Sequence, residues 1–190
     1  MRKKVTGATE AVFPASVTVI DSLAADDARW LPLGGERSWP FKADSTPPLA
    51  WWRTLPLDAL GDAERLFLSA TLEEIAVLDG GDDFANALKG DPAAAIGAAF
   101  SLMPINEVTL QADIAMTALL RCAVERNAAA ALVMAQVTGL TDLGHPYAVE
   151  LAASWLAHGR RFSDNPRKFR EAETVLLTAF RDRHRYGDDA

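Results

Sequence analysis

The prolines of this chain constrain its fold most strongly, because they are crowded into its first third. Six of the ten lie before residue 57, at positions 14, 32, 40, 47, 48 and 56. Proline fixes φ and lacks a backbone donor, so this stretch cannot hold a long helix. The other four coincide with expected helix boundaries. We therefore divide the chain into an N-terminal arm, residues 1–57, and a helical domain, residues 58–190.

The N-terminal arm is predicted to be extended and to contain short β-strands. Ser16–Ile20 alternates β-branched residues with period two, which is typical of a strand. Arg29–Trp39 could form a hairpin that turns at Gly34-Gly35. So few strands cannot make an independent core, which favours an arm that lays its tryptophans on the helical body.

The rest of the chain predicts a mainly α fold, an orthogonal bundle of about six helices. Expected N-caps are Asp62, Asp91, Asn106, Asn127 and Asn165. The expected helical spans, two of them without a predicted N-cap, are 62–80, 82–88, 92–104, 107–126, 127–139, 146–158 and 166–186. We expect 107–126 to be buried on nearly all sides. For the last helix we expect a stripe at three- and four-residue spacing, made of Phe169, Ala172, Leu176, Ala179, Phe180 and Arg183.

Alanine supplies 35 of the 190 residues, and two alanine-rich stretches resemble one another. A shift of 36 residues aligns Gly90–Ile96 with Arg126–Leu132. Helical hairpins of about this length form solenoids, but a solenoid needs roughly three of them. Two helical-hairpin repeats within a plain bundle are therefore the alternative to an unrepeated bundle.

Composition favours a cytoplasmic protein without a cofactor. Cys122 is the only cysteine, so no intramolecular disulfide can form. The basic N-terminus is not followed by an apolar signal segment, and we expect no membrane association. No phosphate-binding loop, nucleophile elbow, zinc pattern or EF-hand loop is present, so we expect neither a metal nor a cofactor.

One polar stripe has the ingredients of acyl-transfer catalysis. Glu150, Ser154 and His158 are spaced four residues apart on one predicted helix, and His145 precedes it. A nucleophile also needs an oxyanion site from another element, so we favour a solvated helix face over catalysis. Cys122 lies among apolar residues and is interpreted as a buried structural thiol.

Charge is divided unevenly along the chain. The net charge is −7, yet residues 160–187 carry 8 basic and 4 acidic side chains. Basic clustering of this kind can mark a nucleic-acid surface, although cations also complement helix C-termini. The candidate contact residues are Arg160, Arg161, Arg167, Lys168 and Arg170.

We therefore expect a non-catalytic α-helical interaction protein, an adaptor or regulator that binds a protein partner or itself. Trp51 and Trp52 could anchor it in a partner groove, or they could lie on its own core. The first alternative is a nucleic-acid-associated regulator that uses the basic C-terminal helix. The second is an enzyme with a site around His145, Glu150 and His158. Exchange of the N-terminal arm between the two chains of a dimer is compatible with an interaction protein.

Overall fold

The computed structural model describes residues 39–75 and 81–187, and every regular element in these ranges is helical. A mainly α fold is thereby confirmed. The predicted strand at Ser16–Ile20 lies outside the described residues, as does the predicted hairpin except for Trp39. The elements are η1 (Pro48–Ala50), α2 (Trp51–Thr54), η2 (Leu57–Ala59), α3 (Asp62–Glu73), α4 (Gly81–Leu88), α5 (Pro92–Ser101), α6 (Leu110–Val124), α7 (Ala128–Leu140), α8 (Ala148–Phe162) and α9 (Pro166–Gly187).

The described part of the predicted arm, residues 39–57, is not extended. It folds into η1 and α2, and its apolar side chains join the same core as the helical domain. Trp51, Trp52 and Leu55 are buried there. The prolines shorten the helices as expected, but the large indoles bury more apolar area when the segment folds onto the body. Residues 39–57 and the following helices therefore share one hydrophobic core.

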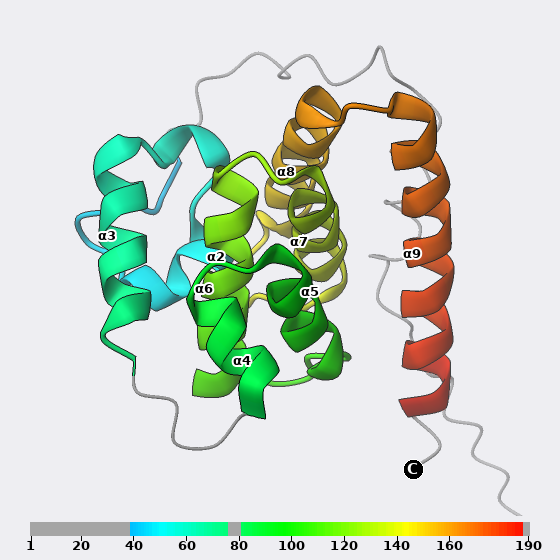
Figure 1. Ribbon diagram of the computed structural model, residues 1–190, viewed down its shortest axis with the longest axis horizontal. Helices are drawn as coiled ribbons and strands as arrows, with labels where there is room; N and C mark the ends of the chain where they lie inside the picture. The colour runs from blue at the N-terminus through cyan, green and yellow to red at the C-terminus, as the bar shows by residue number, and fades with distance from the viewer. Residues whose placement is uncertain (1–38, 76–80, 188–190) are drawn as a thin grey trace, which may run out of the picture.

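Helices α6 and α7 form the centre of the molecule (Figure 1). Ten residues of α6 are buried, as expected for a helix covered on most sides. In α7, all residues from Ala130 to Gly139 are buried. The alanines of α6 and α7 place little bulk between neighbouring helices, which permits close packing of their axes. Helices α3 and α9 lie on opposite sides of this centre (Figure 1).

The turns before α5 and α7 have the same geometry. Gly90 has φ +92° and Arg126 has φ +72°, and each precedes an N-cap residue. The amide of Asp91 bonds to the carbonyl of Asn86, and that of Asn127 bonds to the carbonyl of Cys122. This pattern is the Schellman ending of a helix. The 36-residue shift therefore aligns two turns that are alike in backbone conformation.

Three predicted helix boundaries are wrong. α3 ends at Glu73 instead of near Gly80, with the amide of Ile75 bonded back to the carbonyl of Leu72. α6 begins at Leu110 instead of Glu107, and its N-cap is Thr109, whose side chain accepts a hydrogen bond from the amide of Ala112. α8 continues through the glycine expected to end it.

Gly159 lies inside α8 for a packing reason. A Cβ atom there would lie 2.8 Å from Cζ of Phe169 and 3.2 Å from the carbonyl oxygen of Ala128. Glycine therefore lets α8 approach both α7 and α9. A glycine that ends a helix commonly adopts the left-handed conformation, whereas Gly159 lies within α8 and permits close contact between helices.

The predicted stripe of α9 is partly wrong. Phe169 and Phe180 are buried as expected, but Ala172 and Ala179 are exposed. Glu173 is buried in their place and lies 3.3 Å from Nη2 of Arg160. The ring of Phe180 stacks on that of Phe100 of α5 at 5.0 Å. The contact face of α9 thus contains an ion pair that an apolar pattern cannot identify.

Candidate functional site

A groove lies between residues 43–48 and helix α3. Its volume is about 630 Å³. Trp51, which is only 2% exposed, forms its floor. Pro47 and Pro48 line one side, and Ala63 and Phe67 of α3 line the other.

Phe67 is the main apolar group that this groove presents to solvent. Its side chain is 56% exposed, and its ring centroid lies 6.0 Å from that of Trp51. The neighbouring Leu66 is 73% exposed but does not line the groove. Phe67 thus places an exposed aromatic ring beside the buried indole of Trp51.

Hydrogen bonds from two indoles hold residues 39–54 in place, and one of them closes a wall of the groove. Nε1 of Trp51 donates to the carbonyl of Thr46 at 2.8 Å, which closes the loop that forms one wall. Nε1 of Trp39 donates to the carbonyl of Thr54 at 2.7 Å. An indole N–H that is removed from water usually finds such a partner, and each of these bonds restricts the geometry of the segment.

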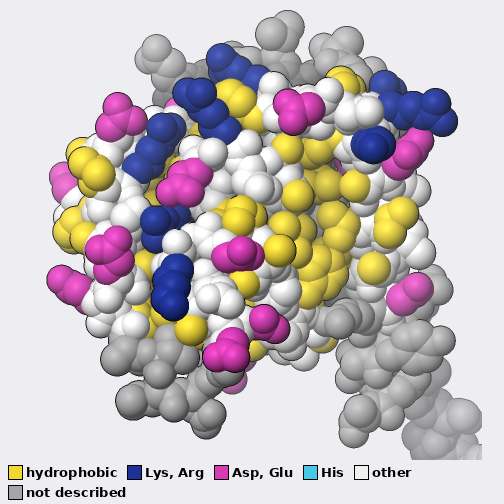
Figure 2. Space-filling model, in the orientation of Figure 1, with side chains coloured by type: hydrophobic (Ala, Val, Ile, Leu, Met, Phe, Trp, Pro, Cys, Tyr) yellow, Lys and Arg dark blue, Asp and Glu magenta, His cyan; other side chains and the backbone are white. Residues whose placement is uncertain are grey.

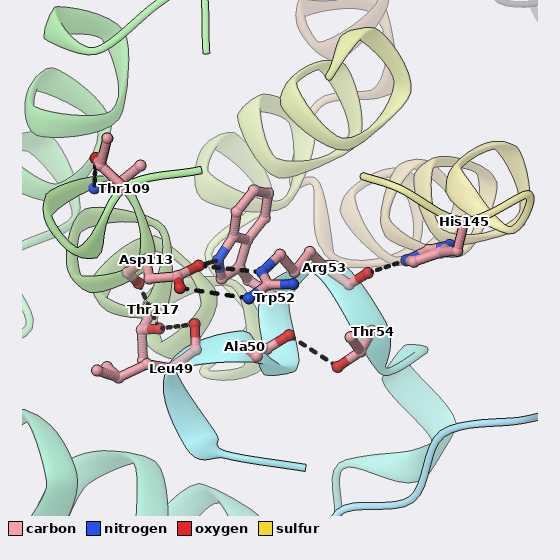
Figure 3. A network of polar contacts seen from close by, with 10 residues as sticks. Leu49, Ala50, Trp52, Arg53, Thr54, Thr109, Asp113, Thr117 and His145 are labelled. Atoms are coloured by element: carbon pink, nitrogen blue, oxygen red, sulfur yellow. Dashed lines mark hydrogen bonds and ion pairs between the residues drawn. The ribbon is translucent and has the colours of Figure 1, made fainter. Parts of the chain in front are cut away.

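Asp113 of α6 holds α2 in place through hydrogen bonds to two of its side chains (Figure 3). Its Oδ1 accepts hydrogen bonds from Nε1 of Trp52 at 2.7 Å and from Nε of Arg53 at 3.2 Å. Thr117 donates to the carbonyl of Asp113 at 2.7 Å and to that of Leu49 at 3.3 Å. One carboxylate therefore positions α2, and with it the floor of the groove.

The charged side chains that line the groove are both acidic. Asp44 lies in the loop wall and Glu64 in the first turn of α3. Oε2 of Glu64 accepts a hydrogen bond from the amide of Gly61 at 2.9 Å, which holds its carboxylate at the rim. The groove thus combines an apolar floor with negative charge at its edge.

The two tryptophans predicted as partner anchors are buried in the protein's own core. Trp51 is 2% exposed and Trp52 is fully buried. The alternative that both pack on the body is therefore the one the structure supports. Trp51 still contributes to the groove as its floor, and Phe67 is the ring that reaches solvent.

The residues of the predicted acyl-transfer stripe do not bond to one another. Oγ of Ser154 donates to the carbonyl of Leu151 in its own helix. Nε2 of His158 contacts the carbonyl oxygen of Ala123 at 2.9 Å, and Glu150 is exposed. Hydroxyls in helices commonly bond back to a preceding carbonyl, as that of Ser154 does. The favoured interpretation of a solvated helix face fits the exposed Glu150 but is wrong for His158, which is buried.

His145 lies apart from that stripe, against α2 (Figure 3). Its Nε2 contacts the carbonyl oxygen of Arg53 at 2.5 Å, and its Nδ1 accepts from the amide of Tyr147 at 3.2 Å. This pattern requires the proton on Nε2. The ring packs against Phe41 and Tyr147, so the histidine links the α7–α8 connection to residues 39–54.

The basic residues predicted to contact nucleic acid have different environments. Arg160 pairs with the buried Glu173, and Arg167 pairs with Glu171 one turn along α9. Lys168 and Arg170 are exposed. Arg161 lies over the ring of Phe162, with its guanidinium carbon 5.4 Å from the ring centroid. These five residues thus do not form one continuous set of free cations.

Cys122 is buried in α6, as predicted from its apolar neighbours. Desolvation is the largest cause that raises the pKa of its thiol to about 11, and the charge of Glu125 acts in the same direction. A thiol with this pKa is almost entirely protonated near neutral pH and is a poor nucleophile.

Phe67 and Arg126 were not identified from the sequence as residues of a candidate site. Leu66, Phe67 and Leu68 are consecutive apolar residues, and a helix cannot bury three neighbours on one face. Exposure of one or two of them could have been anticipated. Arg126 gave no such signal, because its position depends on the left-handed turn that places it.

Comparison with models of known protein families, with curated protein sequences and with solved structures finds no match to this chain. In the described ranges, no helix combines the length and the apolar character needed to cross a membrane. Among the same residues, no three His, Cys, Asp or Glu side chains are grouped as a metal ion would require.

Proposed function

We propose that this protein is a non-catalytic α-helical interaction protein that binds a partner protein in the groove beside α3. The observation that carries the proposal is the exposed ring of Phe67, which borders a groove of about 630 Å³ with Trp51 as its floor. Anchoring of one aromatic or aliphatic side chain in such a groove is how many helical domains bind partner segments.

The charges of the groove favour one kind of partner. Asp44 and Glu64 line it, and the whole chain carries a net charge of −7. A segment with apolar anchors flanked by Lys or Arg complements both features. Charge complementarity of this kind speeds association and selects against acidic partners.

Residues 39–57 support the proposal by making the groove rigid. The bonds from Trp51 to Thr46 and from Trp52 to Asp113 hold both the wall and the floor. A preformed groove loses little conformational entropy when it binds, which leaves more of the contact energy for affinity.

The test uses a defined probe, an amphipathic peptide of about 15 leucine, alanine and lysine residues with its leucines on one helical face. Two control peptides replace each Lys by Glu, or scramble the leucines so that they share no face. Chemical-shift mapping on the full chain locates each binding site. We expect the first peptide alone to shift the resonances of Phe67, Ala63 and the Trp51 indole.

Variants then separate the groove from nonspecific charge attraction. Phe67→Ser should weaken peptide binding about tenfold, as expected for loss of an anchoring aromatic contact. Leu66→Ser is the matched control, because Leu66 is exposed on the same helix but outside the groove. Equal weakening by both variants, or shifts confined to other surfaces, would contradict the proposal. Concentration-dependent shifts at Phe67 without peptide would identify a second copy of the chain as the occupant.

A further inference from the structure

Three arginines from separate elements gather around one end of the bundle. Arg65 lies in α3, Arg126 in the turn between α6 and α7, and Arg161 in the last turn of α8. All three act electrostatically on the buried His158. Figure 2 shows Lys and Arg side chains grouped at the upper edge of the molecule on the side of α3.

The ring of Phe162 brings two of these cations together. The guanidinium carbon of Arg126 lies 5.1 Å from its centroid and that of Arg161 lies 5.4 Å from it. Both distances are within the cation–π range of about 6 Å. The two like charges are therefore held on the order of one Debye length apart or less.

Within the described part of the chain, these charges are poorly neutralised. Neither Arg126 nor Arg161 forms an ion pair there. Arg65 contacts Asp62 at 3.4 Å, but that carboxylate is almost fully solvated, and Nε of Arg65 is buried without a hydrogen-bond partner. By contrast, Arg53, Arg121, Arg160 and Arg167 each pair with a carboxylate.

We propose that Arg65, Arg126 and Arg161 form a binding site for a phosphate group. Guanidinium groups present forked donors that match phosphate oxygens. Two of them lie against the ring of Phe162, and the third, that of Arg65, has a buried Nε without a hydrogen-bond partner. Because two guanidinium groups already lie over Phe162, its ring serves to hold the cations and is not free to stack on a base. The site therefore recognises the phosphate itself, carried either by a small phosphate ester or by the backbone of a nucleic acid.

Calorimetric titration of the full chain tests the site with inorganic phosphate, with pyrophosphate and with a mixed-sequence single-stranded DNA oligonucleotide. Binding of the small anions identifies the free ester as the source. Binding of the oligonucleotide alone, with a steep salt dependence, identifies the backbone. Absence of binding by all three probes overturns the proposal.

Variants show whether the named arginines carry the binding. Arg161→Gln should lower the affinity about tenfold or more, as expected for loss of a charge-assisted hydrogen bond. Arg126→Asn should do the same, and asparagine tolerates the left-handed conformation at this position. Arg170→Gln, an exposed arginine of α9, is the matched control and should leave the affinity unchanged.

A purely structural role gives a different result. Arg126 and Arg161 lie at helix C-termini, where cations stabilise the helix dipole. If that is their only role, both variants lower the thermal midpoint and leave the affinity for phosphate unchanged, which overturns the proposal. A second readout is the NMR titration of His158, whose pKa should rise when phosphate is bound and should not respond to chloride at equal ionic strength.

Discussion

His158 links the packing of one side chain to its chemistry. Its ring lies on the buried face of α8, and Nε2 must carry the proton that bonds to the carbonyl of Ala123. Desolvation is the largest cause that lowers its pKa below 6.5, and Arg65, Arg161 and Arg126 act in the same direction, whereas the backbone bond opposes them. The folded protein therefore favours the neutral ring.

This environment predicts a pH-dependent stability. Between the lowered folded pKa and the unfolded value of about 6.5, the unfolded chain binds more protons, so the free energy of unfolding falls as the pH is lowered. Above the unfolded pKa, the stability that His158 contributes by staying neutral is fully present. We expect His158→Gln to reduce the loss of stability between about pH 7 and pH 5, measured by urea unfolding. Glu150→Gln, exposed on the same helix, should leave the loss unchanged. Equal losses in wild type and His158→Gln would contradict the assignment.

Cys122 gives a second prediction at the residue scale. With a pKa of about 11, its thiol should react slowly with a disulfide reagent at mildly alkaline pH while the chain is folded. The rate should rise sharply in denaturing urea, where burial is lost. Absorbance of the released thiolate measures both rates. Rapid stoichiometric reaction of the native protein would show that the thiol is accessible.

At the scale of the elements, the twin turns before α5 and α7 make a paired prediction. Asp91 accepts from the amide of Ala94 at 2.7 Å, and Asn127 accepts from that of Ala130 at 2.9 Å. Replacing either cap with alanine should cost about 1 kcal/mol of stability. Chemical denaturation measures the loss. Costs that differ several-fold would show that the two turns are not energetically equivalent.

A substitution at Gly90 tests the backbone conformation of the first of these turns without altering its N-cap residue. Its φ of +92° disfavours any L side chain, and an added Cβ would lie 3.3 Å from Cζ of Arg121. Gly90→Ala should therefore destabilise the protein by about 1 kcal/mol. Gly97→Ala is the matched control, because nothing lies within 4 Å of its added Cβ and alanine favours a helix. A gain in stability at both positions would contradict this account.

These elements also show which parts of the structure a sequence can specify. The caps at Asp91, Asn127 and Asn165 were predicted correctly because each is a local interaction between a side chain and its own helix. The continuation of α8 was not, because the contact of Gly159 with Phe169 depends on residues of another helix. The start of α6 was also missed, although its cap at Thr109 is a local interaction of the same kind.

In the candidate sites too, the residue types can be read from the sequence, but their contacts depend on the fold. Acidic and apolar residues near the groove are visible in the sequence, but only the fold places Phe67 beside Trp51. Likewise, Arg126 and Arg161 are far apart in the chain, and only the fold places both guanidinium groups against the ring of Phe162. The basic character of residues 160–187 pointed to the region that contains Arg161. Two of its other arginines, Arg160 and Arg167, are paired with Glu173 and Glu171.

At the scale of the whole molecule, the shared core determines how the chain can be divided. Trp51, Trp52 and Leu55 lie in one apolar cluster with α6 and α7, and Trp52 is tied to Asp113. Deleting residues 1–57 removes these side chains from the centre of the bundle. Loss of even one buried tryptophan side chain costs about 3–5 kcal/mol, a large part of the stability of a domain of this size.

We therefore expect a fragment of residues 58–190 to lose cooperative unfolding, with a reduced far-ultraviolet helical signal and a broad thermal transition.

Two full-length variants separate the packing of Trp52 from its hydrogen bond to Asp113. Trp52→Phe removes the bond to Asp113 but keeps most of the apolar volume, so it should lower stability by about 1–3 kcal/mol by leaving a partly buried carboxylate with one donor fewer. Trp52→Ala should cost more, since it also leaves a cavity. A fragment that unfolds cooperatively at the midpoint of the full chain would instead support the predicted boundary at residue 57.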